Sequence, residues 1–232
     1  MKIPAFSAIV TILVSMSLHA APVIIAHRGA SEDAPENTLA SIREGWKQQA
    51  DGAEFDIRMT KDGKIVLMHD DTTLRTTDQN LMVKDHSLEE LRKLDAGSWK
   101  GDTWKGEPIP LLEDVMKELP VGKIYYIEIK SGPEILPELA RIIRASGKET
   151  DLLRIIAFDF DTLVESRKLI PEVKTLWIVN GKKDPVTGKK VYPDLADLAE
   201  KAAAAGIDGL NLNRGFPLKE ASVKLIKARG LT

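Results

Sequence analysis

The stretch Ala53–His69, with the sequence AEFDIRMTKDGKIVLMH, contains two strand-like segments joined by a turn signal. Hydrophobic residues recur on both sides of Asp62-Gly63, a residue pair that is typical of tight hairpin turns. The second strand is therefore expected to return antiparallel to the first. With Asp62 and Gly63 as the two turn residues, Asp56 is predicted to lie directly opposite His69.

Outward from this hairpin, strand-like and helix-like segments alternate, which is typical of a parallel α/β domain. Short apolar runs mark parallel strands at residues 23–26, 53–59, 124–129, 154–158, 175–179 and 207–212. Helical patterns lie between or after them, at residues 39–46, 111–119, 135–145, 162–169, 194–205 and 219–228. The sequence thus predicts six βα units. An insertion over about residues 71–110 interrupts them, with one helix start where Ser87 and Glu90 form a capping box.

The composition is that of one globular domain, and its charge balance favours a small-molecule partner over nucleic acid or a membrane. The chain has 232 residues, of which 43% are hydrophobic and 29% are charged, and its formal net charge is -2. This balance gives no basic footprint for nucleic acid or an anionic membrane. The sequence contains no cysteine, which excludes a disulfide framework and a thiol nucleophile.

The N-terminus differs in character from the rest of the chain. Lys2 precedes an apolar run from Phe6 to Leu18, which is shorter than a typical membrane span and is followed by small residues. We interpret residues 1–20 as a secretory signal peptide. Leu18 fits the cleavage pattern poorly, which leaves an uncleaved anchor as the alternative. The domain over residues 21–232 is therefore expected to be exported, as a periplasmic or secreted protein without a stable membrane span.

Three carboxylates stand near the predicted ends of parallel strands, where ligand sites of such folds lie. Glu54, Asp56 and Glu128 interrupt otherwise apolar strands, which is costly unless they are paired or bind a metal. An all-oxygen ligand set suits Mg²⁺ or Ca²⁺ better than zinc. The alternative is an internal salt-bridge set with Arg28 and Lys130.

Basic side chains and two histidines complete a site suited to an anionic phosphodiester. Arg28 can bind phosphate oxygens with a bidentate fork, and Lys130 adds a point charge. Cleavage of a phosphodiester also needs one group that accepts a proton and one that donates it. His27 and His69 are suited to both roles near neutral pH.

Seven motifs, in order along the chain, resemble the landmarks of bacterial glycerophosphodiester phosphodiesterases. They are Ala26-His-Arg-Gly-Ala30, Ala34-Pro-Glu-Asn-Thr38, Gly52-Ala-Glu-Phe-Asp56, Thr60-Lys-Asp-Gly63, Met68-His-Asp70, Ile109-Pro-Leu-Leu112 and Ile127-Glu-Ile-Lys130. The similarity extends from about residue 23 to residue 232, and it is looser after residue 131. It implies a TIM-barrel-like fold of the superfamily that includes the phospholipase-C-like phosphodiesterases.

The resemblance also implies a role for each candidate residue. It assigns His27 and His69 as the acid/base pair, Arg28 and Lys130 to the phosphate, and Glu54, Asp56 and Glu128 to one divalent cation, Ca²⁺ or Mg²⁺. Glu36 and Asn37 lie in a loop similar to one that lines the family's site and are taken as substrate-binding residues. Either Asn37 or Thr38 can cap the following helix, and for Asn37 this capping role is as open as substrate binding.

The reaction implied is the metal-dependent hydrolysis of a glycerophosphodiester to sn-glycerol 3-phosphate and an alcohol. A related phospholipase-type phosphodiesterase is one alternative, and an inactive relative that acts as a binding protein is another. Family members usually continue with two more barrel strands, so the sequence supplies six of eight. We therefore expect these 232 residues alone to be poorly soluble or inactive.

Two further features have no assigned role in the chemistry. Trp99 and Trp104 are expected to pack the insertion onto the barrel, with contact to the leaving alcohol as the alternative. The lysines at positions 182, 183, 189 and 190 are expected to lie in a solvated loop, with contact to an anionic substrate as the alternative.

Overall fold

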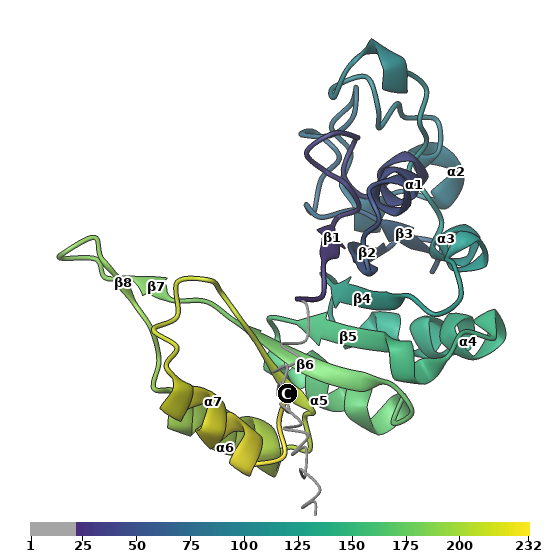
Figure 1. The fold of residues 1–232 in the computed structure, drawn as a ribbon. Helices are drawn as coiled ribbons and strands as arrows, with labels where there is room; N and C mark the ends of the chain where they lie inside the picture. The colour runs from purple at the N-terminus through teal and green to yellow at the C-terminus, as the bar shows by residue number, and fades with distance from the viewer. Residues whose placement is uncertain (1–21) are drawn as a thin grey trace, which may run out of the picture.

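The computed structural model describes residues 22–232, so the predicted signal peptide over residues 1–20 lies outside the described residues (Figure 1). The strands of the main sheet are β1 (Ile25–His27), β2 (Gly52–Met59), β3 (Ile65–Leu67), β4 (Ile124–Ile129), β5 (Leu153–Ala157), β6 (Lys174–Val179) and β9 (Gly209–Leu212). The helices are α1 (Leu39–Lys47), α2 (Leu88–Leu91), α3 (Leu112–Glu118), α4 (Leu136–Ser146), α5 (Phe160–Leu169), α6 (Leu195–Ala204) and α7 (Glu220–Ala228).

The main sheet is a curled, mostly parallel sheet that forms a half-barrel. Its strands follow the order β1-β2-β4-β5-β6-β9, each parallel to the next. Strand β3 pairs antiparallel with the last part of β2, beyond the residues that pair with β1. All six predicted parallel strands are therefore confirmed, as is the α/β fold of TIM-barrel type. In Figure 1 the helices α3, α4 and α5 lie along one side of this curved sheet.

The core lies between the sheet and these helices because outward-facing strand residues are apolar. Phe55 and Ile57 on β2 and Ile127 on β4 are fully buried, and they pack with Leu139 and Ile143 of α4 in one cluster. The alternation along β2 and β4 then leaves their charged residues on the inner face of the sheet. This division places the candidate site inside the curve of the half-barrel.

The hairpin between β2 and β3 forms, but its predicted register is wrong by one residue. Ile57 pairs with Leu67, and the Met68 amide donates to the Asp56 carbonyl at 3.0 Å, so Asp56 lies opposite Met68 and not His69. The turn contains three residues instead of two, and Gly63 adopts the left-handed conformation with a φ of 73°. Three-residue hairpin loops commonly end on such a residue, which shifts the pairing by one position.

The insertion over residues 71–110 builds a small core of its own beside β3. The cluster contains Val66, Met68, Val83, Leu91, Leu94, Ala96 and Ile109. Helix α2 begins at the predicted capping box of Ser87 and Glu90. Trp99 is 40% exposed and donates its indole N–H to the Ala96 carbonyl at 2.9 Å, so it anchors a local turn and lies outside this core.

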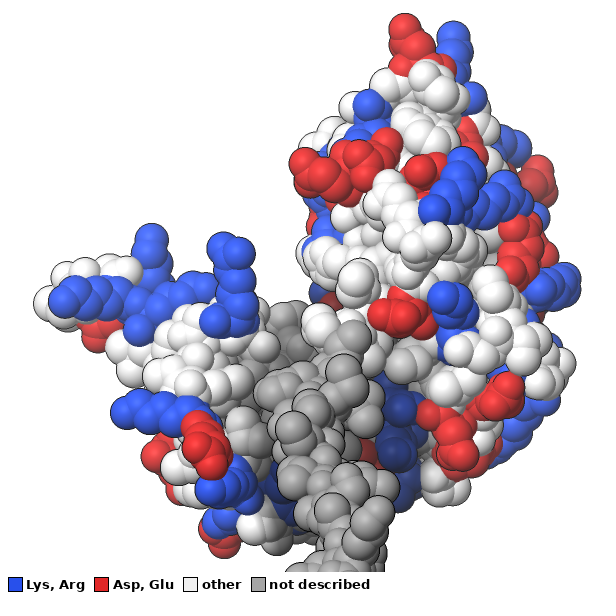
Figure 2. Space-filling model, in the orientation of Figure 1, with Lys and Arg blue, Asp and Glu red and all other residues white. Residues whose placement is uncertain are grey.

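The segment with four lysines forms a short two-stranded arm and is not an irregular loop. Strands β7 (Lys182–Lys183) and β8 (Lys190–Val191) pair antiparallel, and the arm projects from the body of the protein (Figure 1). Its lysines are exposed, as predicted, and Figure 2 shows them as a basic projection. Across residues 22–232, no helix has the length and apolar character needed to span a lipid bilayer.

Candidate active site

Three carboxylates meet because neighbouring strands are in register. The pairing of β1 with β2 sets His27 beside Glu54, and the pairing of β2 with β4 sets Asp56 beside Glu128. One carboxylate oxygen from each of the three acids lies within 4.8 Å of the other two. All three residues are at least 93% buried, with exposures of 6%, 0% and 7% for Glu54, Asp56 and Glu128. The structure thus brings the predicted metal ligands together.

Asp56 is the centre of this cluster and binds three polar side chains. Its carboxylate lies 3.3 Å from Arg28 Nε and 3.3 Å from Lys130 Nζ. Asn37 donates to Asp56 Oδ2 at 2.8 Å, and the Asp56 amide donates back to Asn37 Oδ1 at 3.0 Å. The cap of α1 is Thr38, which accepts from the Ser41 amide. Asn37 therefore contacts the carboxylate cluster, and capping is the role of Thr38 and not of Asn37. The contact of Asn37 with substrate stays a prediction.

Glu54 and Glu128 are less completely neutralised than Asp56. Lys130 forms an ion pair with Glu128, and the Arg28 amide donates to Glu54 Oε2 at 2.9 Å. Glu54 Oε1 is buried and has no hydrogen-bond donor within residues 22–232. Burial, and then the charge of Asp56, raise the pKa of Glu54 to about 8, and burial also raises the pKa of Glu128.

The turn after β1 holds Arg28 in a conformation that few non-glycine residues adopt. Arg28 and Gly29 both have positive φ values, of 56° and 74°. The Arg28 carbonyl accepts hydrogen bonds from the Asn37 amide at 3.0 Å and from Ser41 Oγ at 2.9 Å. Such conformations persist where surrounding contacts enforce them, and they concentrate at functional sites. Gly29 allows the turn to approach α1 closely.

Replacing Gly29 by alanine should destabilise the protein by about 3 kcal/mol, from the positive φ together with overpacking. A Cβ atom at this position would lie 2.5 Å from the Ser41 carbonyl carbon and 2.7 Å from the Ile42 amide nitrogen, both backbone atoms. Gly63 is the matched control because its φ is 73° but nothing lies within 4 Å of an added Cβ. Gly63→Ala should cost only about 1 kcal/mol. Equal losses in urea unfolding of the two variants would contradict the close-packing argument.

The two candidate histidines lie at the same end of the half-barrel. His27 is two-thirds exposed and its Nε2 lies 3.8 Å from Glu54 Oε2. Partial desolvation, and then the Arg28 guanidinium, lower the pKa of His27. The ring of His69 contacts Asp70 Oδ1 through Nδ1 at 2.6 Å, which leaves Nε2 for a substrate.

The geometry and charge of this site agree with the comparisons to known proteins. The glycerophosphoryl diester phosphodiesterase family matches residues 27–232. The chain belongs to this family. A glycerophosphodiester phosphodiesterase of Bacillus subtilis is 34% identical over 224 residues, which cover 89% of the chain and 73% of that protein. One of Caldanaerobacter subterraneus is 41% identical over 158 residues, covering 66% of the chain and 64% of that protein.

Solved structures of the family share the fold. A phosphodiesterase of Oleispira antarctica, determined in complex with its product sn-glycerol 3-phosphate, aligns with a TM-score of 0.77 and 30% identity. The alignment covers 91% of the chain and 82% of that structure. A glycerophosphodiester phosphodiesterase of Agrobacterium tumefaciens aligns with a TM-score of 0.73 and 25% identity, covering 90% of the chain and 83% of that structure.

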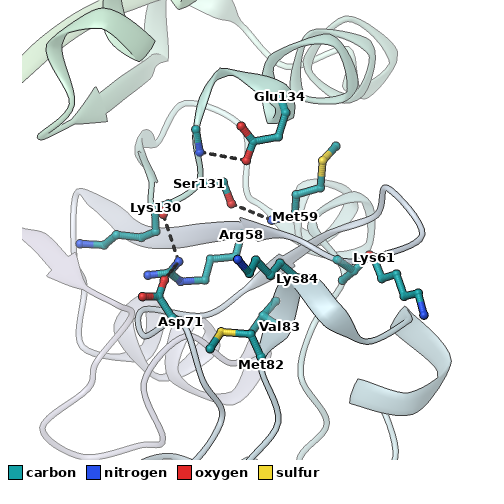
Figure 3. Close-up of a pocket in the computed structure, with 12 residues that line it drawn as sticks. Arg58, Met59, Lys61, Asp71, Met82, Val83, Lys84, Lys130, Ser131 and Glu134 are labelled. Atoms are coloured by element: carbon teal, nitrogen blue, oxygen red, sulfur yellow. Dashed lines mark hydrogen bonds and ion pairs between the residues drawn. The ribbon is translucent and has the colours of Figure 1, made fainter.

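Two hollows border the site. One, of about 460 Å³, lies inside the half-barrel and is lined by His27, Glu54 and Tyr126 together with apolar residues of β6 and β9. The other, of about 570 Å³, lies between the β4 end and the insertion, and Figure 3 shows Arg58 extending across it. Arg58 donates to the carbonyls of His69 at 2.8 Å and Lys130 at 3.0 Å. Arg58 thus connects the segments that follow β3 and β4, beside the second hollow.

Sequence reasoning did not assign roles to three charged residues at the site. Asp70 could have been found because it directly follows His69 in a quoted motif. Arg58 continues the inward-facing alternation of β2, which is a weaker signal. Arg75 lies in the insertion, and nothing in its spacing indicated that it contacts Glu36. The insertion, which the sequence predicts only to interrupt the βα units and to pack onto the barrel, thus also places a side chain at the site.

Proposed function

We propose that this protein hydrolyses glycerophosphodiesters to sn-glycerol 3-phosphate and an alcohol, with a bound divalent cation. The observation that carries the proposal is that Glu54, Asp56 and Glu128 lie together in a chain of this family. The side chains of Arg28 and Lys130 lie beside them and form ion pairs with Asp56. The product in the similar Oleispira antarctica structure supports the choice of substrate class.

The carboxylate cluster fits a hard divalent cation such as Ca²⁺ or Mg²⁺. Within residues 22–232, Arg28 and Lys130 are the cationic side chains that form ion pairs with Asp56 and Glu128, so two positive charges face three carboxylates. Glu54 Oε1 is buried and has no hydrogen-bond partner within residues 22–232, so it is an oxygen that could bind the cation. Glu54, Asp56 and Glu128 would hold the cation. Once bound, it would offset charge on the phosphate oxygens and make a nearby hydroxyl more acidic.

Arg28 and Lys130 would bind the phosphodiester. Both are largely buried, with side-chain exposures of 19% and 12%, and both contact Asp56. A guanidinium can donate two parallel hydrogen bonds to phosphate oxygens, while an ammonium acts as a point charge. Asn37 contributes indirectly because its two hydrogen bonds fix the orientation of Asp56.

The two histidines supply the proton transfers. One imidazole accepts the proton of the glycerol 2-hydroxyl as its oxygen attacks phosphorus, and the other donates a proton to the alcohol oxygen as its bond to phosphorus breaks. Water then adds to the cyclic phosphodiester, and the ring opens to sn-glycerol 3-phosphate while the two imidazoles exchange roles. Each proton transfer of this kind contributes about 10²-fold to 10⁴-fold in rate.

We also propose that the protein is exported, as a periplasmic or secreted enzyme. The apolar pattern of residues 1–20 supports this localisation. N-terminal sequencing of the protein recovered from periplasm and medium tests it. A mature N-terminus near residue 21 is expected, and recovery of the intact chain from the cytosol alone would contradict export.

The activity is tested with purified protein and glycerophosphocholine, and turnover would contradict the expectation from the sequence that these residues alone are inactive. Release of sn-glycerol 3-phosphate, measured with a coupled dehydrogenase, should require Ca²⁺ or Mg²⁺ and should stop on addition of EDTA. Lysophosphatidylcholine in a parallel reaction separates this activity from a phospholipase-type phosphodiesterase. Turnover of the lysolipid alone would favour that second class, and binding without turnover of either compound would favour an inactive relative.

A further inference from the structure

A continuous series of charged contacts runs from Arg28 to His69 through Arg75. Its Nη1 and Nη2 donate to Glu36 Oε2 and Oε1 at 2.7 and 2.8 Å, and its Nε donates to Asp70 Oδ2 at 2.6 Å. Glu36 Oε1 also accepts from Arg28 Nη1 at 2.9 Å, and Asp70 Oδ1 contacts His69 Nδ1 at 2.6 Å. Arg75 therefore lies between the phosphate-binding arginine and a candidate acid/base histidine.

The geometry uses the full shape of a guanidinium group. All three nitrogens of Arg75 are engaged, two with one carboxylate and the third with another. A planar fork can bridge two carboxylates at fixed angles, whereas an ammonium cannot hold them in one orientation. The pKa of Asp70 is lowered to about 2, chiefly by its hydrogen bond with Arg75. This carboxylate therefore stays charged beside His69.

The loop that carries Arg75 is held by buried threonines. Thr73 is fully buried, and its hydroxyl donates to the Gln79 carbonyl at 2.7 Å and accepts from the Leu81 amide at 3.0 Å. Thr76, next to Arg75, is 5% exposed. On a mobile loop these contacts would cost the conformational entropy of the backbone as well as that of the arginine side chain. Here the hydrogen bonds of the loop already fix the backbone, so only the side chain has to be ordered. The guanidinium is thus presented to Glu36 and Asp70 in advance of substrate binding.

We propose that Arg75 is a positioning residue that sets the orientation of His69 through Asp70 and of Arg28 through Glu36. The inference rests on the proposed function, since it gives Arg75 a task in that same site. It also gives the insertion a role in catalysis, because the insertion carries the side chain that links Arg28 to His69. Glu36, predicted to bind substrate, acts in this arrangement by holding Arg28.

The inference is tested by kinetics of Arg75→Gln, Arg75→Ala and Arg75→Lys. Arg75→Gln should lower kcat by about 10²-fold, the size expected for a misplaced catalytic group. The melting temperature should change little because the Arg75 side chain is 44% exposed. Lysine should restore only a small part of the rate, since it cannot bridge both carboxylates. Guanidinium ion at millimolar concentration should partly restore kcat of Arg75→Ala.

The matched control is Arg92, whose side chain is 42% exposed and forms an ion pair with Asp114 away from the site. Arg92→Gln should keep the wild-type kcat, and guanidinium should not accelerate Arg92→Ala. Full activity of Arg75→Gln would overturn the inference, as would a loss of activity that lysine restores completely or that guanidinium does not relieve. An inactive wild-type protein would instead overturn the proposed function, so the two failures are distinguishable.

Discussion

Replacing His69 by glutamine should lower kcat for glycerophosphocholine by about 10³-fold, within the range for loss of one acid/base group. Glutamine keeps a polar side chain that can still reach Asp70, but it has no group that titrates near neutral pH. The Michaelis constant should change by less than about 3-fold, because a group that acts only in the transition state affects kcat and kcat/KM alike.

His86 provides the control for this experiment. It lies in the insertion, where its ring nitrogen Nδ1 contacts the Met82 carbonyl at 2.9 Å. His86→Gln should retain full activity. The double variant of His27 and His69 should be hardly slower than the slower single variant, since acid and base act as a unit. A His69→Gln enzyme with normal kcat would remove this histidine from the mechanism.

The strands and helices could be predicted because periodicity is a local property. Strand β4 forms over Ile124–Ile129 with the bounds expected, and the alternation of β2 correctly placed Glu54 and Asp56 on one face. The hairpin register could not be obtained in the same way. It depends on whether Gly63 alone, or Asp62 and Gly63 together, adopt the left-handed conformation, which gives a three-residue or a two-residue turn. The same sequence is compatible with both turns.

The site could be predicted only as far as the parallel sheet determines it. The carboxylates converge because β2 pairs in register with its parallel neighbours, which places Asp56 beside Glu128 within the strands and not only at their ends. Asn37 was ambiguous because asparagine is suited to capping and also to hydrogen bonding a carboxylate. Arg75 was not assigned because its contacts span 39 residues to Glu36 and depend on how the insertion folds back. Long-range contacts of this kind leave no periodic trace in a sequence.

The Glu54→Gln variant should lose the stabilisation by a divalent cation that the wild-type protein shows. A ligand at 100 times its dissociation constant raises the free energy of unfolding by about 2.7 kcal/mol, and this gain should be absent in the variant. Hydrolysis of glycerophosphocholine should fall together with metal binding. Thermal melts with and without Ca²⁺ or Mg²⁺, and calorimetric titration of each ion, measure both effects. Glu118→Gln, which changes an exposed carboxylate paired with Arg43, should keep the full metal response.

The pH dependence of stability gives this prediction a second, independent measurement. In the metal-free protein the pKa of Glu54 is raised from 4.5 to about 8, so the folded state holds this proton more tightly than the unfolded chain. The contribution of Glu54 to stability is therefore complete below about pH 4.5 and is lost as the pH rises toward 8. Glutamine cannot ionise, so the metal-free variant should lack this decline and equal or exceed the wild type in stability at pH 8. A variant that binds metal and hydrolyses substrate normally would show that Glu54 is not a ligand, and its burial would then need another explanation.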